Sequence, residues 1–216
     1  MFQKFILILF IPWLLSSSQK KKRVVFFGDS ITELAVKPWG FISLLDSIAN
    51  SANSKFEFLG AGVSSDKIYD LYLRMEKDVM SKAPQVVVIF IGVNDVWHKT
   101  LLGTGTDANK FTRFYQAVID KLTAKKIKII LATPAAIGEK TSGNPLDNEL
   151  DKYCELVLDL AVKNKLALVD LRKQFRAYNK IHNTEDKYSG ILTYDGVHLN
   201  DEGNKLVAGE MWKALK

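Results

Sequence analysis

Short apolar runs alternate with stretches of helical periodicity along most of the chain. The apolar runs, rich in β-branched and aromatic residues, predict strands at residues 24–27, 56–59, 86–91, 127–132 and 166–169. Apolar residues spaced three or four apart predict helices at about residues 39–49, 68–80, 108–124, 147–163 and 202–215. This alternation is typical of a parallel sheet with right-handed crossovers, so we expect a three-layer α/β/α sandwich.

The length and composition favour one globular domain. At 216 residues the chain is long enough for one well-packed core, and its hydrophobic fraction of 47% is ordinary for an enzyme. We expect the domain at residues 24–216, after a basic linker at residues 19–23. The formal net charge of +6 owes much to Lys20, Lys21, Lys22 and Arg23, and no aromatic-and-basic stripe accompanies it, so nucleic acid is not an expected partner.

Residues 1–18 have the pattern of a secretory signal peptide. Lys4 precedes an apolar run at residues 5–15, which is short for a bilayer span, and three serines follow it. We therefore expect a secreted or periplasmic protein with no stable membrane insertion after signal cleavage. An uncleaved anchor or a buried helix is the alternative, which Pro12 disfavours. Cys154, the only cysteine, is expected in the core and leaves no intrachain disulfide.

Gly28, Asp29 and Ser30 follow directly after the first predicted strand. Open α/β sheets bind ligands at the carboxyl ends of their strands, so Ser30 is the candidate nucleophile. A serine hydroxyl needs an imidazole to take its proton and a carboxylate to orient that imidazole. Asp195 and His198, three residues apart near the end of the chain, are the candidate pair. A turn or helix cap is the structural alternative for Ser30.

A third segment provides a candidate oxyanion donor. The predicted strand at residues 86–91 leads into Gly92-Val93-Asn94-Asp95, where the Asn94 amide is placed to donate to a developing oxyanion. The three segments, in this order, resemble the SGNH hydrolases, the GDSL-like esterases and lipases, over nearly the whole mature chain. The resemblance implies a flavodoxin-like strand order of 2-1-3-4-5, the Ser30 backbone N–H as a further oxyanion donor, and no cofactor.

The segment after the second predicted strand departs from the family pattern. The family has a Gly-x-Ser-Gly-Asp type of loop whose last glycine gives a backbone N–H to the oxyanion, whereas this chain has Ser65 before Asp66. A backbone donor survives the change, and a side chain is penalised only if φ is positive. We predict Ser65 as the oxyanion donor, with Gly62 as the alternative.

Two residues and two loops are candidates for substrate contact. Asp29 and His98 lie next to the predicted catalytic segments, although hydrogen bonds that shape the loop are the alternative for Asp29. His182 lies in a polar stretch and is expected at the surface. Residues 97–107 and 133–145 are predicted as long loops at the active edge and as walls of the substrate site.

Two other chemistries fit the sequence less well. The turn at residues 60–62 resembles a dinucleotide-binding turn, but the next strand does not end in the acidic residue that such a site needs. A metal cluster of Asp29, Asp95, Asp195 and His198 would leave the serine and the asparagine without a role. We therefore predict no metal ligands.

These features predict a serine esterase that acts through an acyl-enzyme on Ser30. Because no lid or apolar surface helix is evident, we expect short esters as substrates, such as O-acetyl groups on glycans or related small molecules. A lysophospholipase or acyl-thioesterase is the alternative enzyme. A catalytically silent carbohydrate-binding module is the alternative without activity, and it is expected to lack Ser30, Asn94 or His198, all of which are present.

Overall fold

A computed structural model describes residues 21–216, and the predicted signal peptide lies outside the described residues. The elements follow in the order β1 (Lys22–Gly28), α1 (Ser30–Leu34), α2 (Phe41–Ser51), β2 (Phe56–Gly62), α3 (Ile68–Asp78), a short 3₁₀ helix (Met80–Lys82), β3 (Val86–Phe90), α4 (Val93–Leu102), α5 (Ala108–Ala124), β4 (Lys128–Ala132), α6 (Pro145–Asn164), β5 (Ala167–Val169), α7 (Leu171–His182) and α8 (Asp201–Leu215).

The five strands form one parallel sheet in the order β2-β1-β3-β4-β5, which confirms the predicted topology. Gly28, the last residue of β1, pairs with Gly62 of β2 and with Phe90 of β3. The strands that carry the candidate segments therefore end level with one another. This register brings three segments that are far apart in sequence to one edge of the sheet.

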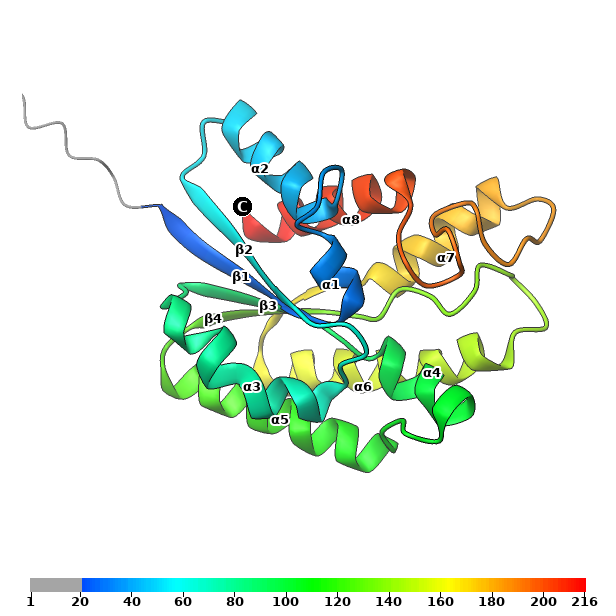
Figure 1. Ribbon diagram of the computed structural model, residues 1–216, viewed down its shortest axis with the longest axis horizontal. Coiled ribbons are helices and arrows are strands. Elements are labelled where there is room, and N and C mark those ends of the chain that lie inside the picture. The colour runs from blue at the N-terminus through cyan, green and yellow to red at the C-terminus, as the bar shows by residue number, and fades with distance from the viewer. Residues whose placement is uncertain (1–20) are drawn as a thin grey trace, which may run out of the picture.

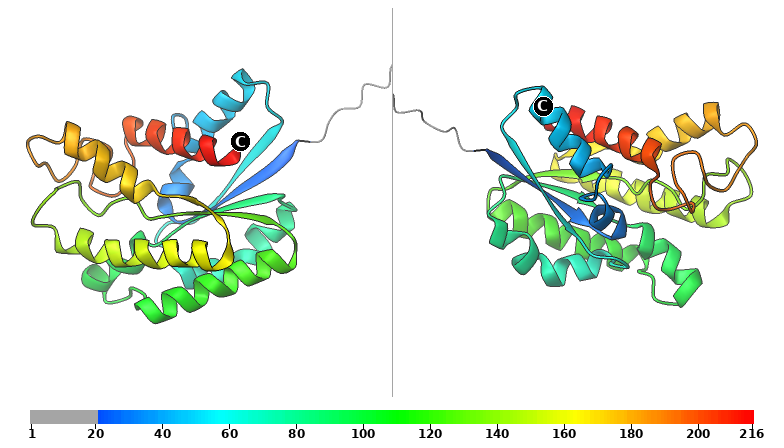
Figure 2. Two further views of the ribbon diagram at one scale, coloured as in Figure 1. Left: turned by 180° about the vertical axis from the view of Figure 1, so that it is seen from behind. Right: turned by 45° about the horizontal axis from the view of Figure 1, so that its top comes forward.

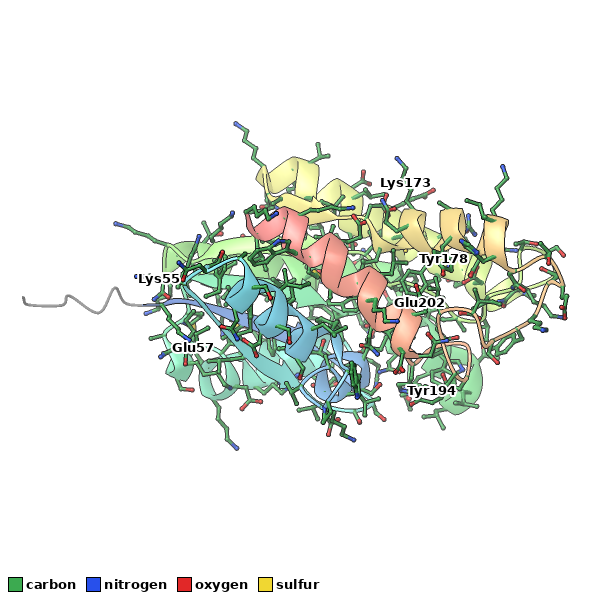
Figure 3. All side chains as sticks on the ribbon, turned by 90° about the horizontal axis from the view of Figure 1, so that it is seen from above. Lys55, Glu57, Lys173, Tyr178, Tyr194 and Glu202 are labelled. Carbon is green, nitrogen blue, oxygen red and sulfur yellow. The ribbon has the colours of Figure 1, made fainter. Side chains whose placement is uncertain are left out.

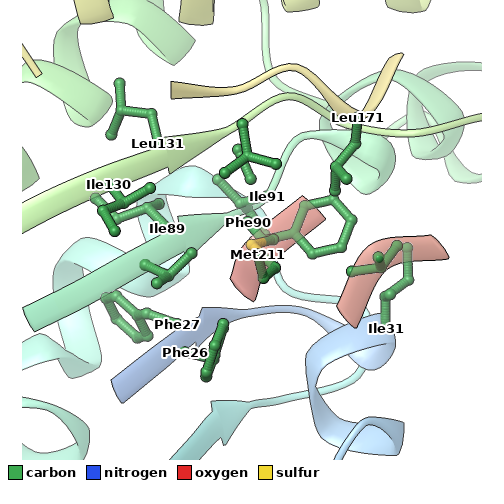
Figure 4. Close-up of a cluster of buried hydrophobic side chains, with 14 of the residues drawn as sticks. Phe26, Phe27, Ile31, Ile89, Phe90, Ile91, Ile130, Leu131, Leu171 and Met211 are labelled. Atoms are coloured by element: carbon green, nitrogen blue, oxygen red, sulfur yellow. The ribbon is translucent and has the colours of Figure 1, made fainter. Parts of the chain in front are cut away.

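Helices cover both faces of the sheet (Figures 1 and 2). The contacts pair α2 with α8 on one face and α3 with α5 on the other, where α6 also packs on α5. Residues 24–27 and 86–91 are buried on both sides of the sheet, which explains why these strands are continuous apolar runs in the sequence. Figure 4 shows Phe26 and Phe90 in this core together with Met211 of α8.

Three helices were not predicted from the sequence, namely α1, α4 and α7. Helix α4 occupies the first half of the segment predicted as a loop at residues 97–107, so that prediction is wrong over residues 97–102. The loop predicted at residues 133–145 is present and ends at Asn144, the N-cap of α6. Strand β1 begins at Lys22, so the predicted linker ends inside a strand. Cys154 is buried in α6, as predicted.

Within residues 21–216, no helix combines the length and apolar content that crossing a membrane requires.

Candidate active site

Ser30 is the first residue of α1, immediately after the end of β1. Asp29 caps this helix by accepting the Ile31 N–H at 3.0 Å. The Ser30 Oγ lies 2.9 Å from His198 Nε2, although 168 residues separate them in sequence. The Ser30 N–H faces out of the helix end with no acceptor among the described residues. Hydroxyl, imidazole and a free N–H therefore meet at one point, as the proposed nucleophile requires.

Asp195 and His198 lie on the loop between α7 and α8. The His198 Nδ1 is 2.6 Å from Asp195 Oδ2, while Asp195 Oδ1 accepts the N–H groups of Val197 and His198 at 2.9 and 2.7 Å. Although partial burial opposes ionisation, these hydrogen bonds hold the pKa of Asp195 below its usual value. An ionised Asp195 accepts a hydrogen bond from the His198 Nδ1–H group, which leaves the Nε2 lone pair facing the Ser30 hydroxyl.

Tyr194 covers one face of the His198 ring. The two rings are nearly parallel, with an interplanar angle of 13° and centroids 5.6 Å apart. Tyr194 is 59% exposed, and Figure 3 shows it at the surface near the start of α8. No sequence pattern indicates this contact, because a tyrosine beside an Asp-x-x-His segment has no required orientation.

The predicted oxyanion donors lie on the loops after β2 and β3. Asn94 is buried, and its Nδ2 donates to the Asp66 carbonyl oxygen at 3.1 Å, which leaves its second N–H for another acceptor. Ser65 has a φ of +70°, and its N–H has no acceptor among the described residues. The Lys67 Nζ donates to the Ser65 carbonyl at 3.1 Å. The carbonyl groups of residues 65 and 66 are therefore hydrogen bonded, while the Ser65 N–H is left for an acceptor such as the oxyanion.

Gly62, the alternative donor, has a packing reason to be glycine. A Cβ at this position would lie 2.1 Å from the Glu33 backbone nitrogen and 2.6 Å from the Asp29 carbonyl oxygen. The absence of a side chain therefore lets β2 approach the start of α1. This close approach accounts for the glycine without any role as a donor.

Asp29 and His98 have little surface to offer a substrate. Asp29 is 2% exposed and His98 is 6% exposed, and the substrate contacts of both side chains stay predictions. Burial raises the pKa of Asp29 to about 7, against the Ile31 hydrogen bond, which lowers it. For Asp29 the structure favours the alternative considered from the sequence, a carboxyl group that shapes its loop.

Asp95 has a similar structural role. It is fully buried and accepts the Ile68 N–H at 3.2 Å, at the start of α3. Burial raises its pKa to about 7 as well. No three histidine, cysteine or acidic side chains within residues 21–216 converge as metal ligands, so Asp29, Asp95, Asp195 and His198 do not form the cluster considered from the sequence.

The loop at residues 133–144 and helix α7 line a polar cleft of about 640 Å³. Its walls include Asn144, Arg176 and Asn179, and none of the three candidate catalytic residues contributes to them. This loop contacts the Asp195–His198 loop through the Gly138 N–H, which donates to the Gly196 carbonyl at 2.7 Å. The loop predicted as a substrate wall therefore contacts the loop that carries Asp195 and His198.

A serine, an imidazole and a carboxylate in one hydrogen-bonded line, at the carboxyl edge of a parallel sheet, define a serine-dependent hydrolase. The model of the GDSL-like Lipase/Acylhydrolase family matches residues 26–206, and the chain belongs to this family. It is a carboxylic ester hydrolase of the SGNH type.

Several esterases are similar to this chain. One is an acetyl xylan esterase of known crystal structure, whose sequence is 53% identical and whose structure superimposes with a TM-score of 0.88, over 90% of this chain and 100% of that chain. The acetylxylan esterase of Geobacillus stearothermophilus is 28% identical over 206 residues, which cover 87% of this chain and 90% of the relative. A GDSL esterase/lipase of Oryza sativa subsp. japonica is 23% identical over 89% of this chain and 76% of the relative.

Proposed function

We propose that this enzyme removes acetyl groups from acetylated xylan or xylo-oligosaccharides. The observation that carries the proposal is the 53% identity between this chain and an acetyl xylan esterase, over the whole length of that esterase. In the present protein, Ser30, His198 and Asp195 form one hydrogen-bonded line. A likeness that extends over the full relative includes the loops around the site, which select the substrate. Acetylated glycan is therefore the preferred class among the short esters predicted from the sequence.

The proposed reaction begins with attack on the acetyl carbonyl carbon by Ser30 Oγ, as His198 Nε2 takes the hydroxyl proton. The carbonyl oxygen becomes an oxyanion that accepts hydrogen bonds from the Ser30 N–H, the Ser65 N–H and the Asn94 amide. Collapse of this intermediate breaks the bond to the sugar oxygen, which takes the proton from His198. Acetyl-Ser30 remains.

Water then completes the proposed cycle. His198 takes a proton from the water as the water oxygen attacks the acetyl carbon. The second oxyanion then collapses, the bond between the acetyl carbon and Ser30 Oγ breaks, and acetic acid leaves and ionises to acetate in solvent. The proton returns from His198 to Ser30 Oγ. Asp195 stays ionised throughout and stabilises the imidazolium that forms in both halves of the reaction.

The substrate proposal is tested with a series of p-nitrophenyl esters from acetate to palmitate, together with acetylated xylo-oligosaccharides. We expect kcat/KM to be highest for acetate and to fall with each longer acyl chain, and we expect acetate release from the oligosaccharides. The Ser30→Ala variant is the control for uncatalysed hydrolysis. Preference for octanoate or longer chains would contradict the proposal and favour the lysophospholipase or thioesterase alternative.

We also propose that the protein is exported, on the pattern of residues 1–18. Export fits the polymeric part of the proposed substrate, because a polymer such as xylan is too large to enter a cell. N-terminal sequencing of the protein recovered from the medium or periplasm is expected to start near Gln19. Recovery of the chain with Met1 intact would contradict cleavage.

A further inference from the structure

Glu139 is a buried carboxylate that the proposed reaction does not use. It lies on the loop between β4 and α6 and is 2% exposed. Burying a carboxylate away from water is costly unless its oxygens are fully hydrogen bonded. In this structure no lysine or arginine among the described residues forms an ion pair with Glu139. Its partners are backbone amides instead.

Three consecutive backbone N–H groups donate to the Glu139 carboxylate. The Ile191 N–H donates to Oε2 at 2.8 Å, and the N–H groups of Leu192 and Thr193 donate to Oε1 at 2.5 and 2.7 Å. Hydrogen bonds to an ionised acceptor are roughly twice as strong as those between neutral groups. One side chain therefore holds the backbone of residues 191–193 against the loop after β4.

The segment at residues 191–193 leads directly into the candidate catalytic loop. Thr193 forms an antiparallel bridge with Leu199, which closes the loop that carries Asp195 and His198. The Tyr194 N–H donates to the His198 carbonyl at 2.9 Å within this loop. A shift of residues 191–193 would therefore move the whole loop, including the imidazole that faces Ser30.

Glu139 is itself fixed in place from two directions. Its N–H donates to the Tyr188 carbonyl at 2.8 Å, and its carbonyl accepts the Asn183 Nδ2 at 2.8 Å. The neighbouring Gly138 N–H donates to Gly196 between Asp195 and His198. Because the loop follows β4, these bonds connect the Asp195–His198 loop to the sheet edge that also places Ser30.

We propose that Glu139 is a positioning residue that sets the Asp195–His198 pair in line with Ser30. This inference rests on the proposed catalytic role of those three residues. A misplacement of about 1 Å costs on the order of 10² in rate. Loss of the Glu139 carboxylate therefore acts on kcat through the geometry of the pair, beyond any loss of stability.

The test compares Glu139→Gln with Glu57→Gln. Gln keeps the shape of the side chain but replaces one acceptor oxygen with an N–H₂ group, which opposes the donors at residues 191–193. Glu57 is the control for the same substitution, because its carboxylate also accepts a hydrogen bond, from Arg23 Nε at 2.8 Å, but lies near the amino end of β2, opposite the candidate catalytic edge of the sheet. Unfolding curves of both variants establish the temperature at which each is folded.

At that temperature we expect Glu139→Gln to lower kcat for p-nitrophenyl acetate by tenfold to a hundredfold with little change in KM. Glu57→Gln is expected to keep kcat within threefold of the wild type. Glu139→Asp, which keeps the charge but is one methylene shorter, is expected to restore part of the kcat lost in Glu139→Gln. It also provides the test if Glu139→Gln does not fold. A folded Glu139→Gln or Glu139→Asp variant with wild-type kcat would overturn the proposal.

A spectroscopic measurement separates this inference from the proposed function. The proton between His198 Nδ1 and Asp195 gives a far-downfield proton resonance, which His198→Ala identifies by removing it. We expect the signal to persist in Glu57→Gln and to broaden or disappear in Glu139→Gln. An unchanged signal in folded Glu139→Gln would contradict the positioning role and leave the proposed function standing, whereas full turnover by Ser30→Ala would contradict the proposed function and with it the basis of this inference.

Discussion

Ser65 adopts a left-handed backbone conformation that favours glycine. Its φ of +70° costs roughly 1–2 kcal/mol for a residue with a Cβ. We predict that Ser65→Gly keeps full esterase activity and raises the free energy of unfolding by up to about 1 kcal/mol. The gain is smaller than the strain relieved, because glycine also gains conformational freedom in the unfolded chain. Chemical denaturation and steady-state kinetics provide the measurement.

The contrasting variant at this position is Ser65→Pro, which deletes the backbone N–H. If Ser65 donates to the oxyanion, any folded Ser65→Pro protein has a reduced kcat. A folded variant with full activity would move the donor role to Gly62. The sequence could identify the missing glycine, but not the positive φ, because the dihedral depends on the contacts of Lys67 and Asn94 with residues 65 and 66.

The Asn94 side-chain amide has two N–H groups with different roles. Its Nδ2 holds the Asp66 carbonyl, and its second N–H is the proposed oxyanion donor. We predict that Asn94→Ala lowers kcat by about 10²–10³ with a smaller effect on KM, because this bond strengthens as the oxyanion forms. Steady-state kinetics on p-nitrophenyl acetate tests this, and an effect confined to KM would argue against an oxyanion role.

Among single residues, the site residues that can be identified from the sequence are those within a short motif. Ser30, Asn94 and the Asp195–His198 pair each stand in a motif beside a predicted strand or at a fixed spacing. Glu139 has no such signature, since its three partners lie more than 50 residues away in sequence. Its role depends on a contact between two irregular loops, which periodicity does not reveal.

At the scale of elements, Arg74 of α3 connects the ends of two strands to the oxyanion loop. Its guanidinium donates to the carbonyls of Gly28 and Ala61 at 2.8 and 3.0 Å and pairs with Asp66 at 2.5 Å. It also lies over the Phe27 ring, 4.7 Å from the centroid. Both strand ends and the loop therefore depend on one side chain.

We predict that Arg74→Leu lowers the free energy of unfolding by about 3–5 kcal/mol, because it leaves a partly buried Asp66 without its partner. We expect kcat to fall as well, since Gly28 precedes Asp29 and Ser30. Arg74→Lys keeps the charge but not the planar fork, so it is expected to recover only part of the stability. Denaturant unfolding measures this, and a loss below 1 kcal/mol in Arg74→Leu would contradict the role.

The unpredicted helices show where sequence patterns were insufficient. Helix α7 has apolar or aromatic residues at Leu171, Phe175 and Tyr178, a helical spacing that its many charged residues obscured. Helix α4 begins directly after Gly92, whose φ of +132° only glycine adopts readily, and extends into residues 97–107, where Gly103 and Gly105 predict a loop. Strands β1 and β3 were predicted well because burial on both faces of the sheet demands continuous apolar runs.

For the whole molecule, two buried carboxyl groups make stability depend on pH near neutrality. Burial raises the pKa of Asp29 and of Asp95 from 3.8 to about 7. Between these values the folded protein binds more protons than the unfolded chain, so the free energy of unfolding falls as the pH rises from 5 to 7 and levels off above 7. Each group contributes up to about 1.4 kcal/mol per pH unit.

Urea unfolding at a series of pH values measures this effect. We predict that Asp95→Asn flattens the dependence between pH 5 and 7, because one of the two groups no longer titrates. The lowered pKa of Asp195 acts in the opposite direction, and only below its usual range, so it does not mask the effect. Stability that rises from pH 5 to 7 in the wild type would contradict the assignment.

In the proposed reaction Ser30 carries the acetyl group, and acetate release from acetylated xylo-oligosaccharides by wild type and Ser30→Ala tests this role most directly. We predict rapid release by the wild type and a loss of about 10⁴-fold or more in Ser30→Ala, because the nucleophile is removed while the fold remains. Unfolding curves that coincide for the two proteins are the control. A folded Ser30→Ala protein that releases acetate at near the wild-type rate would contradict the account.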